Sequence, residues 1–288
     1  PAIPYVYDMD SSLSQQMIEK HRWMALFRPI FNGLERAALR RARAVIPVCP
    51  SLADEAQRLG AGTVELLPDV SLLPGPETVT PDTTLLRDAG ARPYFMYVGN
   101  FEAYQGIDLL LDGWAHAITH NGRGTLLLIG GKPDELARYE RHIAQRGLAG
   151  RVRLYPHQPV DRLAALLAAA DFLLSPRIQG INTPMKIYSY LDSGKPVLAT
   201  RLPTHTQVLT PEVAHLIDPF PEAWGRALAD IPGRADENRR LTEKARALVR
   251  AHHSRDAFQA RARSIYSALA TSVGAPLICV PGSEKSGT

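Results

Sequence analysis

The sequence is poor in cysteine and has no long hydrophobic run. Its 288 residues include two cysteines, Cys49 and Cys279, which lie too far apart in the chain to suggest a disulfide framework or a cysteine metal site. No run of about 18 apolar residues is present, which argues against a membrane-spanning helix. The first ten residues lack a basic segment that leads into an apolar one, as a signal peptide would have. We therefore expect a protein of a reducing, cytoplasmic compartment.

The excess of positive charge is also small. Lys and Arg number 33 against 29 Asp and Glu, and a formal net charge of +4 is too mild to make nucleic acid the expected partner. No cluster of carboxylates and histidines is spaced to hold a cation, so we expect no bound metal. With 45% apolar and 22% charged residues, the composition is that of a folded globular protein.

From residue 92 onward, short apolar runs alternate with amphipathic stretches. Runs of four or five apolar residues between helices are typical of strands that are buried on both faces of a parallel sheet. The pattern predicts strands at 94–98, 125–129, 152–155, 171–175, 196–200 and 214–217. It predicts helices near 106–120, 133–145, 160–169, 184–192, 220–230, 236–251 and 255–270. This arrangement indicates a doubly wound α/β domain.

The first 70 residues show the same alternation in shorter form. Strands are predicted near 4–7, 44–48 and 63–67, and helices near 12–26, 33–42 and 51–59. Three strands are few for an independent doubly wound domain. The chain also starts at Pro1 inside a strand-like segment, which suggests a fragment or a processed product. Residues 71–92 are rich in Pro and Thr, as in an interdomain linker, and residues 272–288 have the composition of a loose tail.

The segment 175–194 has the strongest signal of a ligand site. Ligands of open parallel sheets bind at the carboxyl ends of the strands, and this segment follows one of them. Thr183 before Pro184 has the pattern of a helix start, and the N-terminus of a helix suits a phosphate group. Lys186 in the first turn would oppose the helix dipole, so an anionic ligand explains it better than helix stability does. Ser189 lies on the same face, and the alternative is a surface lysine beside an unrelated serine.

Other loops at this edge have weaker signals. Gly99 and Gly106 bracket the loop after the first strand of the domain. Gly130 and Gly131 end the next strand, where a plain turn and an approach to a pyrophosphate are equally compatible with the sequence. His157 lies on another loop and could contact a base. The glycine spacing matches neither the dinucleotide fingerprint nor the Walker pattern, which disfavours nicotinamide and ATP chemistry.

Three motifs occur in an order and spacing that resemble the group 1 glycosyltransferases. They are Gly99-Asn-Phe-Glu-Ala-Tyr-Gln-Gly-Ile-Asp-Leu-Leu110, Ile129-Gly-Gly131 and Lys186-Ile-Tyr-Ser-Tyr-Leu-Asp-Ser-Gly-Lys-Pro-Val-Leu-Ala-Thr200. The resemblance implies a GT-B-like fold of two doubly wound Rossmann-like domains, of which the amino-terminal one is incomplete here. Residues 1–70 would be a partial acceptor-side domain and residues 93–250 the nucleotide-sugar-binding domain, while a helix at 251–271 would cross back to the first.

The resemblance also implies an activity. Such enzymes move a sugar from a nucleotide-diphosphate sugar to a glycan or lipid-linked acceptor, with retention and with no metal or other cofactor. Polysaccharide biosynthesis at the cell envelope is the process that this implies. Two other functions stay open: a non-catalytic member or inactive fragment that binds nucleotide or glycan, and a nucleotide-sugar epimerase.

The resemblance assigns site residues, and several depart from the family pattern. Gln179 and Ser189 stand where the family has two glutamates, and Asp10 stands near the place of a histidine beside the reacting sugar. Arg177 and Lys186 would supply the positive charge that Asn100 and Gln105 lack. The implied catalytic residues are Asp10, Gln179 and Lys186. The implied donor-binding residues are Gly99, Asn100, Phe101, Gln105, Gly130, Gly131, His157, Arg177, Gly180, Asn182, Thr183, Lys186 and Ser189.

The segment 20–43 combines basic and aromatic residues. It places Lys and Arg beside Trp23, Phe27 and Phe31. Peripheral helices on the anionic inner face of a membrane have this composition. An ordinary amphipathic helix with a solvated basic face has it too, and the sequence leaves both interpretations open.

Overall fold

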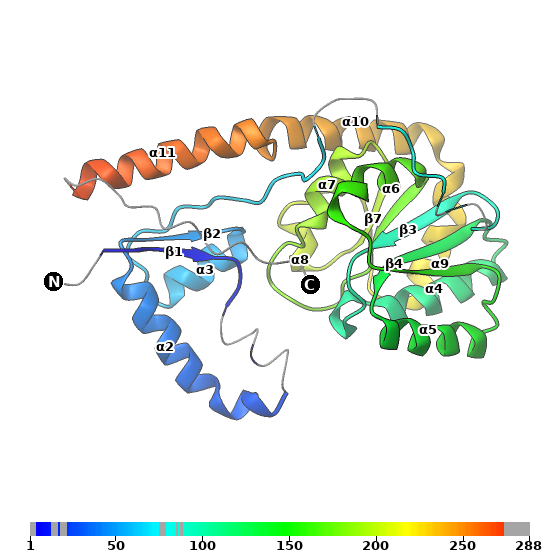
Figure 1. Ribbon diagram of the computed structural model, residues 1–288, viewed down its shortest axis with the longest axis horizontal. Helices are drawn as coiled ribbons and strands as arrows, with labels where there is room; N and C mark the ends of the chain where they lie inside the picture. Colours follow the sequence, from blue (N-terminus) through cyan, green and yellow to red (C-terminus); the bar gives the residue numbers. More distant parts are fainter. Residues whose placement is uncertain are drawn as a thin grey trace.

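A six-stranded parallel sheet forms the centre of the carboxy-terminal half of the chain (Figure 1). The computed structural model describes residues 4–12, 17, 22–74, 79–84, 86 and 89–273. The strands lie in the order β5-β4-β3-β6-β7-β8. Their bounds are β3 Tyr94–Val98, β4 Thr125–Gly131, β5 Val152–Pro156, β6 Phe172–Ser175, β7 Val197–Thr200 and β8 His215–Ile217. All six strands lie where the sequence predicts them, and the change of direction between β3 and β6 confirms the doubly wound class.

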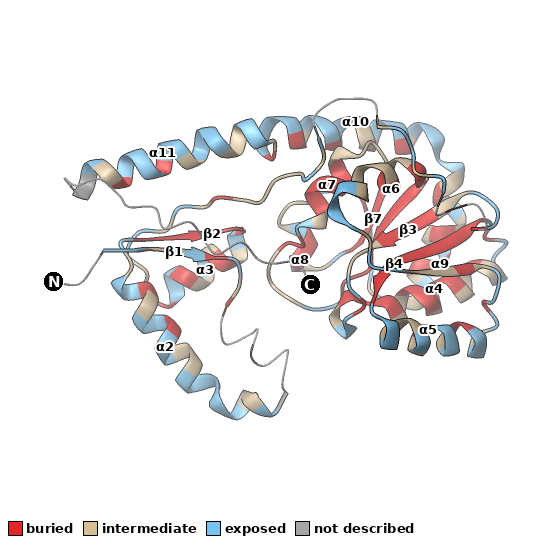
Figure 2. Ribbon diagram, in the orientation of Figure 1, coloured by how far each residue is buried: buried red, intermediate tan, exposed pale blue. Residues whose placement is uncertain are grey.

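Helices cover both faces of this sheet. They are α4 Ile107–Thr119, α5 Pro133–Gln145, α6 Leu163–Ala169, α7 Lys186–Asp192, α8 Pro203–Thr206, α9 Pro221–Asp230 and α10 Ala235–His252. Side chains of β3 alternate between two cores: Phe95 packs in one with Trp114 of α4, and Met96 packs in the other with Tyr190 of α7. Every residue of β4, β6 and β7 is buried (Figure 2). The strands are continuous apolar runs for that reason.

The amino-terminal region has a smaller sheet, in which β1 Val6–Met9 and β2 Ala44–Pro47 pair in parallel. The third strand predicted at 63–67 is reduced to one bridge, between Val64 and Val45. Backbone hydrogen bonds from Val45 N to Thr63 O and from Leu67 N to Pro47 O also join segment 63–67 to β2. The prediction of a full strand is wrong because Pro47 has no N–H to donate, so the ladder lacks a bond at its centre.

Helices of this region are only partly as predicted. They are the 3-10 helix η1 Arg22–Phe27, α2 Arg28–Arg41 and α3 Pro50–Arg58. The predicted helix 12–26 lies largely outside the described residues, and its last part is η1. Helix α2 begins five residues before the predicted start at 33, and Pro29 occupies its first turn, where a proline costs no hydrogen bond.

A long helix, α11 Arg255–Val273, crosses back from the large domain and lies over the small sheet (Figure 1). Its Ile265 and Leu269 pack against Ala44 and Ile46 of β2. The guanidinium of Arg261 donates to the carbonyl of Leu66 at 2.6 Å. The two regions are therefore joined by the linker and by this helix. Of the predicted tail, residues 274–288 lie outside the described residues.

Candidate functional site

The loops after β3, β4 and β6 meet at the carboxyl edge of the large sheet. A Cβ added to Gly130 would collide with the carbonyl of Gly99, so the glycine lets the loop after β3 lie directly on β4. Gly131 and the buried Phe101 pack together beneath the same loop. Gly130, Gly131 and the ring of Phe101 thus let the loop after β3 pack closely on the end of β4.

Lys186, the first residue of α7, places its ammonium group at this edge. Its Nζ lies 3.9 Å from the centre of the Tyr97 ring and 3.4 Å from Oε1 of Gln105. A Cβ at Gly99 would collide with it, so the strand end and the ammonium are in close contact. Burial, together with a smaller effect of the nearby Arg177, lowers the pKa of Lys186 to about 7. Carboxylates are absent from the causes of this shift.

Arg177 supplies a second cation beside Lys186. Its Nε donates to the carbonyl of Gln179 at 2.6 Å, and Nη2 donates to Oδ1 of Asn182 at 2.9 Å. Its guanidinium also lies 5.0 Å from the centre of the Tyr104 ring. Gly180 has a φ of 107°, which lets the loop curl around the guanidinium. The residue is 6% exposed, so an arginine is fixed at the floor of the loop.

The cluster extends to the amino-terminal region across the space between the domains. Nδ2 of Asn182 donates to the carbonyl of Asp10 at 3.5 Å. Gln207, which follows α8, bridges the same junction: its Oε1 accepts from Ser51 N at 3.1 Å, and its Nε2 donates to the carbonyl of Ile181 at 2.8 Å. The loop 177–182 is therefore held between the two regions.

The structure brings most of the predicted residues into one contact network. Those residues are Asp10, Gly99, Gln105, Arg177, Gln179, Gly180, Asn182 and Lys186. Asn100 is exposed at its margin, and its carbonyl accepts from Tyr97 Oη at 2.6 Å. Ser189 is not in the network, because it is 1% exposed and its Oγ accepts from Leu72 N of the linker at 3.0 Å. His157 is exposed on the loop after β5 and is not part of the network among the described residues.

The predicted helix start at Thr183 and Pro184 is wrong by two residues. Helix α7 begins at Lys186, and Thr183 makes no cap hydrogen bond to it. The carbonyl of Asn182 accepts from Thr204 Oγ1 at 2.8 Å, while Ile187 N donates to Pro184 O. Asn182 is thus bonded to α8 and Arg177, outside the helix, and the first turn of α7 starts from the carbonyl of Pro184.

Sequence reasoning missed a buried histidine that supports this loop. His205 of α8 is fully buried, and its Nε2 lies 2.9 Å from Ser175 Oγ. Its Nδ1 lies 2.9 Å from Thr200 Oγ1, which itself donates to the carbonyl of Arg177. Burial lowers the pKa of His205 to about 3, so the ring is neutral in this relay. Helix α8 has four residues, too short to leave a periodic pattern.

His116 of α4 and His120, which directly follows this helix, have the four-residue spacing of a ligand pair, against the expectation that no histidines are spaced to hold a cation. No group of three His, Cys, Asp or Glu that could hold an ion occurs in the described part of the chain. Within the same residues, no helix is both long and apolar enough to cross a bilayer.

A sequence model described as "Glycosyl transferases group 1" matches residues 92–231, the part that holds the sheet and both cations. Residues 92–231 therefore form a group 1 glycosyltransferase domain. This match confirms the resemblance drawn from the three motifs. No curated protein matches the sequence.

Solved structures resemble the chain beyond the matched domain. Sucrose-phosphate synthase from Thermosynechococcus elongatus has a TM-score of 0.76 at 21% identity, over 94% of this chain and 69% of that one. HepE from Anabaena in complex with UDP has a TM-score of 0.75 at 16% identity, over 93% of this chain and 72% of that one. A glycosyltransferase from Rickettsia africae has a TM-score of 0.69 at 14% identity, over 92% and 70%. At these identities the likeness shows the fold, which is GT-B-like.

Proposed function

We propose that this protein transfers a sugar from a nucleotide-diphosphate donor, whose diphosphate lies against Lys186 and Arg177. One observation carries the proposal: two cations lie together at the carboxyl edge of a parallel sheet, and burial makes the charge of Lys186 costly. Among the described residues, no salt bridge joins Lys186 to a carboxylate, so an anionic ligand would stabilise its charged form. The structure of HepE with UDP-glucose supports a nucleotide sugar as that ligand.

The reaction follows from the charges. When the sugar leaves its diphosphate, negative charge grows on the leaving oxygen, and fixed cations that face this oxygen lower the barrier. We assign this role to Lys186 and Arg177 and propose that no metal is needed. We assign Asp10 and Gln179, whose carbonyls bond Asn182 and Arg177 of the same network, to the reacting end of the sugar, and propose transfer with retention on the family resemblance. The acceptor would be a glycan or a lipid-linked sugar.

Nucleoside-diphosphate affinity tests the donor site directly. Lys186→Ala removes a charge-assisted contact, and we expect UDP, or whichever nucleoside diphosphate binds best, to bind about 10- to 150-fold more weakly. Lys244→Ala, which changes an exposed lysine of α10 that pairs with Glu212, is the matched control and should leave affinity unchanged. Calorimetry on the wild type and the two variants tests the placement of the diphosphate. A Lys186→Ala protein that binds the nucleoside diphosphate as tightly as the wild type would refute it. Chelator should leave the same binding curve and any transfer unaltered.

Product analysis separates the two alternatives. A non-catalytic protein would bind the nucleoside diphosphate but transfer no sugar from any nucleotide sugar to any acceptor. An epimerase would convert the nucleotide sugar in the absence of an acceptor. A panel of nucleotide sugars, incubated with and without glycan acceptors and read by mass spectrometry, distinguishes these outcomes from transfer.

We also propose that η1 and α2 contact an anionic membrane surface, where a lipid-linked acceptor would be found. Five large apolar side chains lie on one exposed stripe: Trp23, Leu26, Phe27, Ile30 and Leu34, with exposed fractions between 43% and 83%. Exposed arginines accompany them along α2, which suits anionic headgroups.

Vesicle sedimentation tests this contact. The protein should pellet with phosphatidylglycerol vesicles and not with phosphatidylcholine vesicles, and Trp23→Ser/Ile30→Ser should abolish pelleting while leaving nucleotide affinity intact. Equal pelleting of the double variant would show that the stripe is not the contact. Self-association of the wild type that the double variant lacks would instead assign the stripe to a second copy of the chain.

A further inference from the structure

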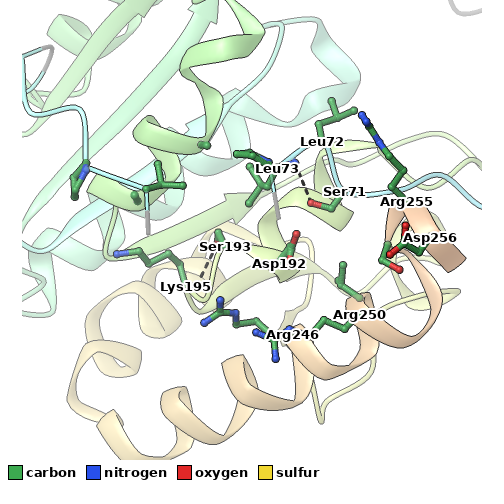
Figure 3. Close-up of a pocket in the computed structure, with 17 residues that line it drawn as sticks. Ser71, Leu72, Leu73, Asp192, Ser193, Lys195, Arg246, Arg250, Arg255 and Asp256 are labelled. Atoms are coloured by element: carbon green, nitrogen blue, oxygen red, sulfur yellow. Dashed lines mark hydrogen bonds between the residues drawn. The ribbon is translucent and has the colours of Figure 1, made fainter. Parts of the chain in front are cut away.

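A second place for an anion lies at the opposite end of α7 from Lys186. A cavity of about 1220 Å³ opens between the linker, α6, the end of α7 and α10 (Figure 3). Linker residues Ser71, Leu72 and Leu73 lie on one side of it, and the arginines of α10 lie on the other. Ser254 to Asp256, at the junction of α10 and α11, complete the wall. Both connections between the two regions therefore border this cavity.

Positive charge predominates in the lining. Four cationic side chains line it, namely Lys195, Arg246, Arg250 and Arg255, against the carboxylates of Asp192 and Asp256. None of these six makes a salt bridge in the part of the chain that the structure describes. A cation near the end of a helix is ordinary, because it complements the helix dipole. Four cations from three segments around one hollow are more than the dipoles of α7 and α10 require.

The remaining wall is apolar and the cavity is roomy. Leu73 and Val79 of the linker face Ala164 and Ala168 of α6, with Val249 of α10 beside them. Small-molecule sites are hollows of about 300–1,000 Å³ with apolar walls and a few charged groups that orient the ligand; this cavity, at about 1220 Å³, is somewhat larger than that. Arg246 and Arg250 stand one turn apart on the same face of α10, so their planar donors can engage two oxyanions of one ligand.

We propose that this cavity binds a soluble small molecule that carries phosphate or diphosphate groups, held by Arg246, Arg250 and Lys195. The ligand would touch the linker and α10 at once. The linker is already tied to the large domain, since Leu72 N donates to Ser189 Oγ and Ser71 N donates to the carbonyl of His253. A bound ligand would tighten that attachment at the junction of the two regions. This inference does not depend on the identity of the donor.

Inorganic pyrophosphate is the probe, and Lys186→Ala is the background, so that the donor site contributes little. In this background we compare Arg246→Gln/Arg250→Gln with Arg240→Gln/Arg263→Gln, which removes two charges from exposed positions outside the cavity. Calorimetry should show one pyrophosphate bound to the background protein. The cavity variant should bind about tenfold more weakly or not at all, and the control variant should match the background within about twofold. Glutamine keeps the apolar stem and hydrogen-bonding capacity of arginine, so folding is preserved.

Three results would overturn the inference. If the cavity variant bound pyrophosphate as tightly as the control variant, Arg246 and Arg250 would not contact the anion. Loss of all pyrophosphate binding on Lys186→Ala alone would show that the donor site is the single anion site, which would support the proposed function and refute this cavity. Absence of binding to the wild type would refute it as well. The donor proposal fails separately, when Lys186→Ala leaves nucleoside-diphosphate affinity unchanged.

Discussion

Lys186 has a pKa of about 7 because burial beside another cation disfavours its charged form. An anionic ligand would reverse this effect by favouring the ammonium. Binding of a diphosphate would then draw a proton to Lys186 at any pH at which the free lysine is partly neutral. A lysine at the surface, with an ordinary pKa near 10.4, would show no such linkage at neutral pH.

Donor affinity should therefore fall as pH rises above about 7, by up to tenfold per pH unit, and be level with respect to this lysine below 7. Calorimetry of nucleoside-diphosphate binding in buffers of different ionisation enthalpy counts the protons taken up. The ligand's own phosphate titration is common to all variants, so Lys186→Met is the control and should lack the uptake. A wild type and a Lys186→Met protein with the same pH profile would contradict this assignment.

Burial lowers the pKa of His205 as well, and this group stays neutral at neutral pH. Its folded pKa of about 3 lies below the ordinary value of 6.5, and Arg177 and Lys186 add to the effect of burial. As pH falls below 6.5, His205 becomes protonated in the unfolded chain but stays neutral in the folded chain. The free energy of unfolding therefore declines with falling pH until the folded pKa is reached. Burial lowers the pKa of His215 and His253 too, and they act in the same direction.

We expect His205→Gln to flatten this decline. Urea unfolding between about pH 4 and 6 should show a slope for the wild type that is steeper by up to one proton, or about 1.4 kcal/mol per pH unit, than the slope for the variant. The amide of glutamine can still bond Ser175 or Thr200, which keeps the variant folded at the start of the series. Parallel slopes would mean that His205 titrates alike in both states.

At the scale of elements, the sequence predicts the large domain well and the small one poorly. Strands such as β4 are buried on both faces, and a run like Leu126–Ile129 has few other interpretations. Strand 63–67 has the same local pattern, but its pairing depends on Pro47 in the neighbouring strand, which no local window reveals. Lys186 could be predicted as a site residue because it follows a buried strand and the Thr183-Pro184 pattern of a helix start. His205 was missed because its role depends on contacts with Ser175 and Thr200, 30 and 5 residues away.

The packing of α7 gives Ser189 a different partner from the one that its position in the sequence predicts. Helical spacing places it on the face of Lys186, but α7 packs that part of its surface against the linker, where Oγ accepts from Leu72 N. Ser189→Ala should lower the free energy of unfolding by about 0.5–1.5 kcal/mol, with little change in nucleoside-diphosphate affinity. Ser193→Ala at the end of the same helix, whose Oγ donates to Tyr190 O, is the local comparison. If Ser189→Ala weakened nucleoside-diphosphate binding without lowering the free energy of unfolding, Ser189 would be a donor-binding residue after all.

At the scale of the whole molecule, the two regions differ in how much they bury. Among the residues that the structure describes, the large domain has two cores of twenty buried residues each, while the two cores of the small region hold eight and five. The five belong partly to α11, which the large domain supplies. Loop 177–182 and Gln207 tie the regions together at the candidate site, so the small region depends on the large one for part of its stability.

Local opening should therefore be easier in the small region, and two arginines allow a matched comparison. Arg36 in α2 and Arg226 in α9 are both exposed in mid-helix, but α2 buries Glu35 and Leu39, whereas α9 buries Trp224 and Leu228 against α4. Trypsin cuts a helix only after it opens, so brief digestion read by mass spectrometry reports the opening of each. We expect cleavage after Arg36 to be at least about tenfold faster, which corresponds to a difference of about 1.4 kcal/mol in opening free energy. Equal rates at the two sites would mean that the small region is as stable as the large domain, and that its few buried side chains are enough to hold it closed.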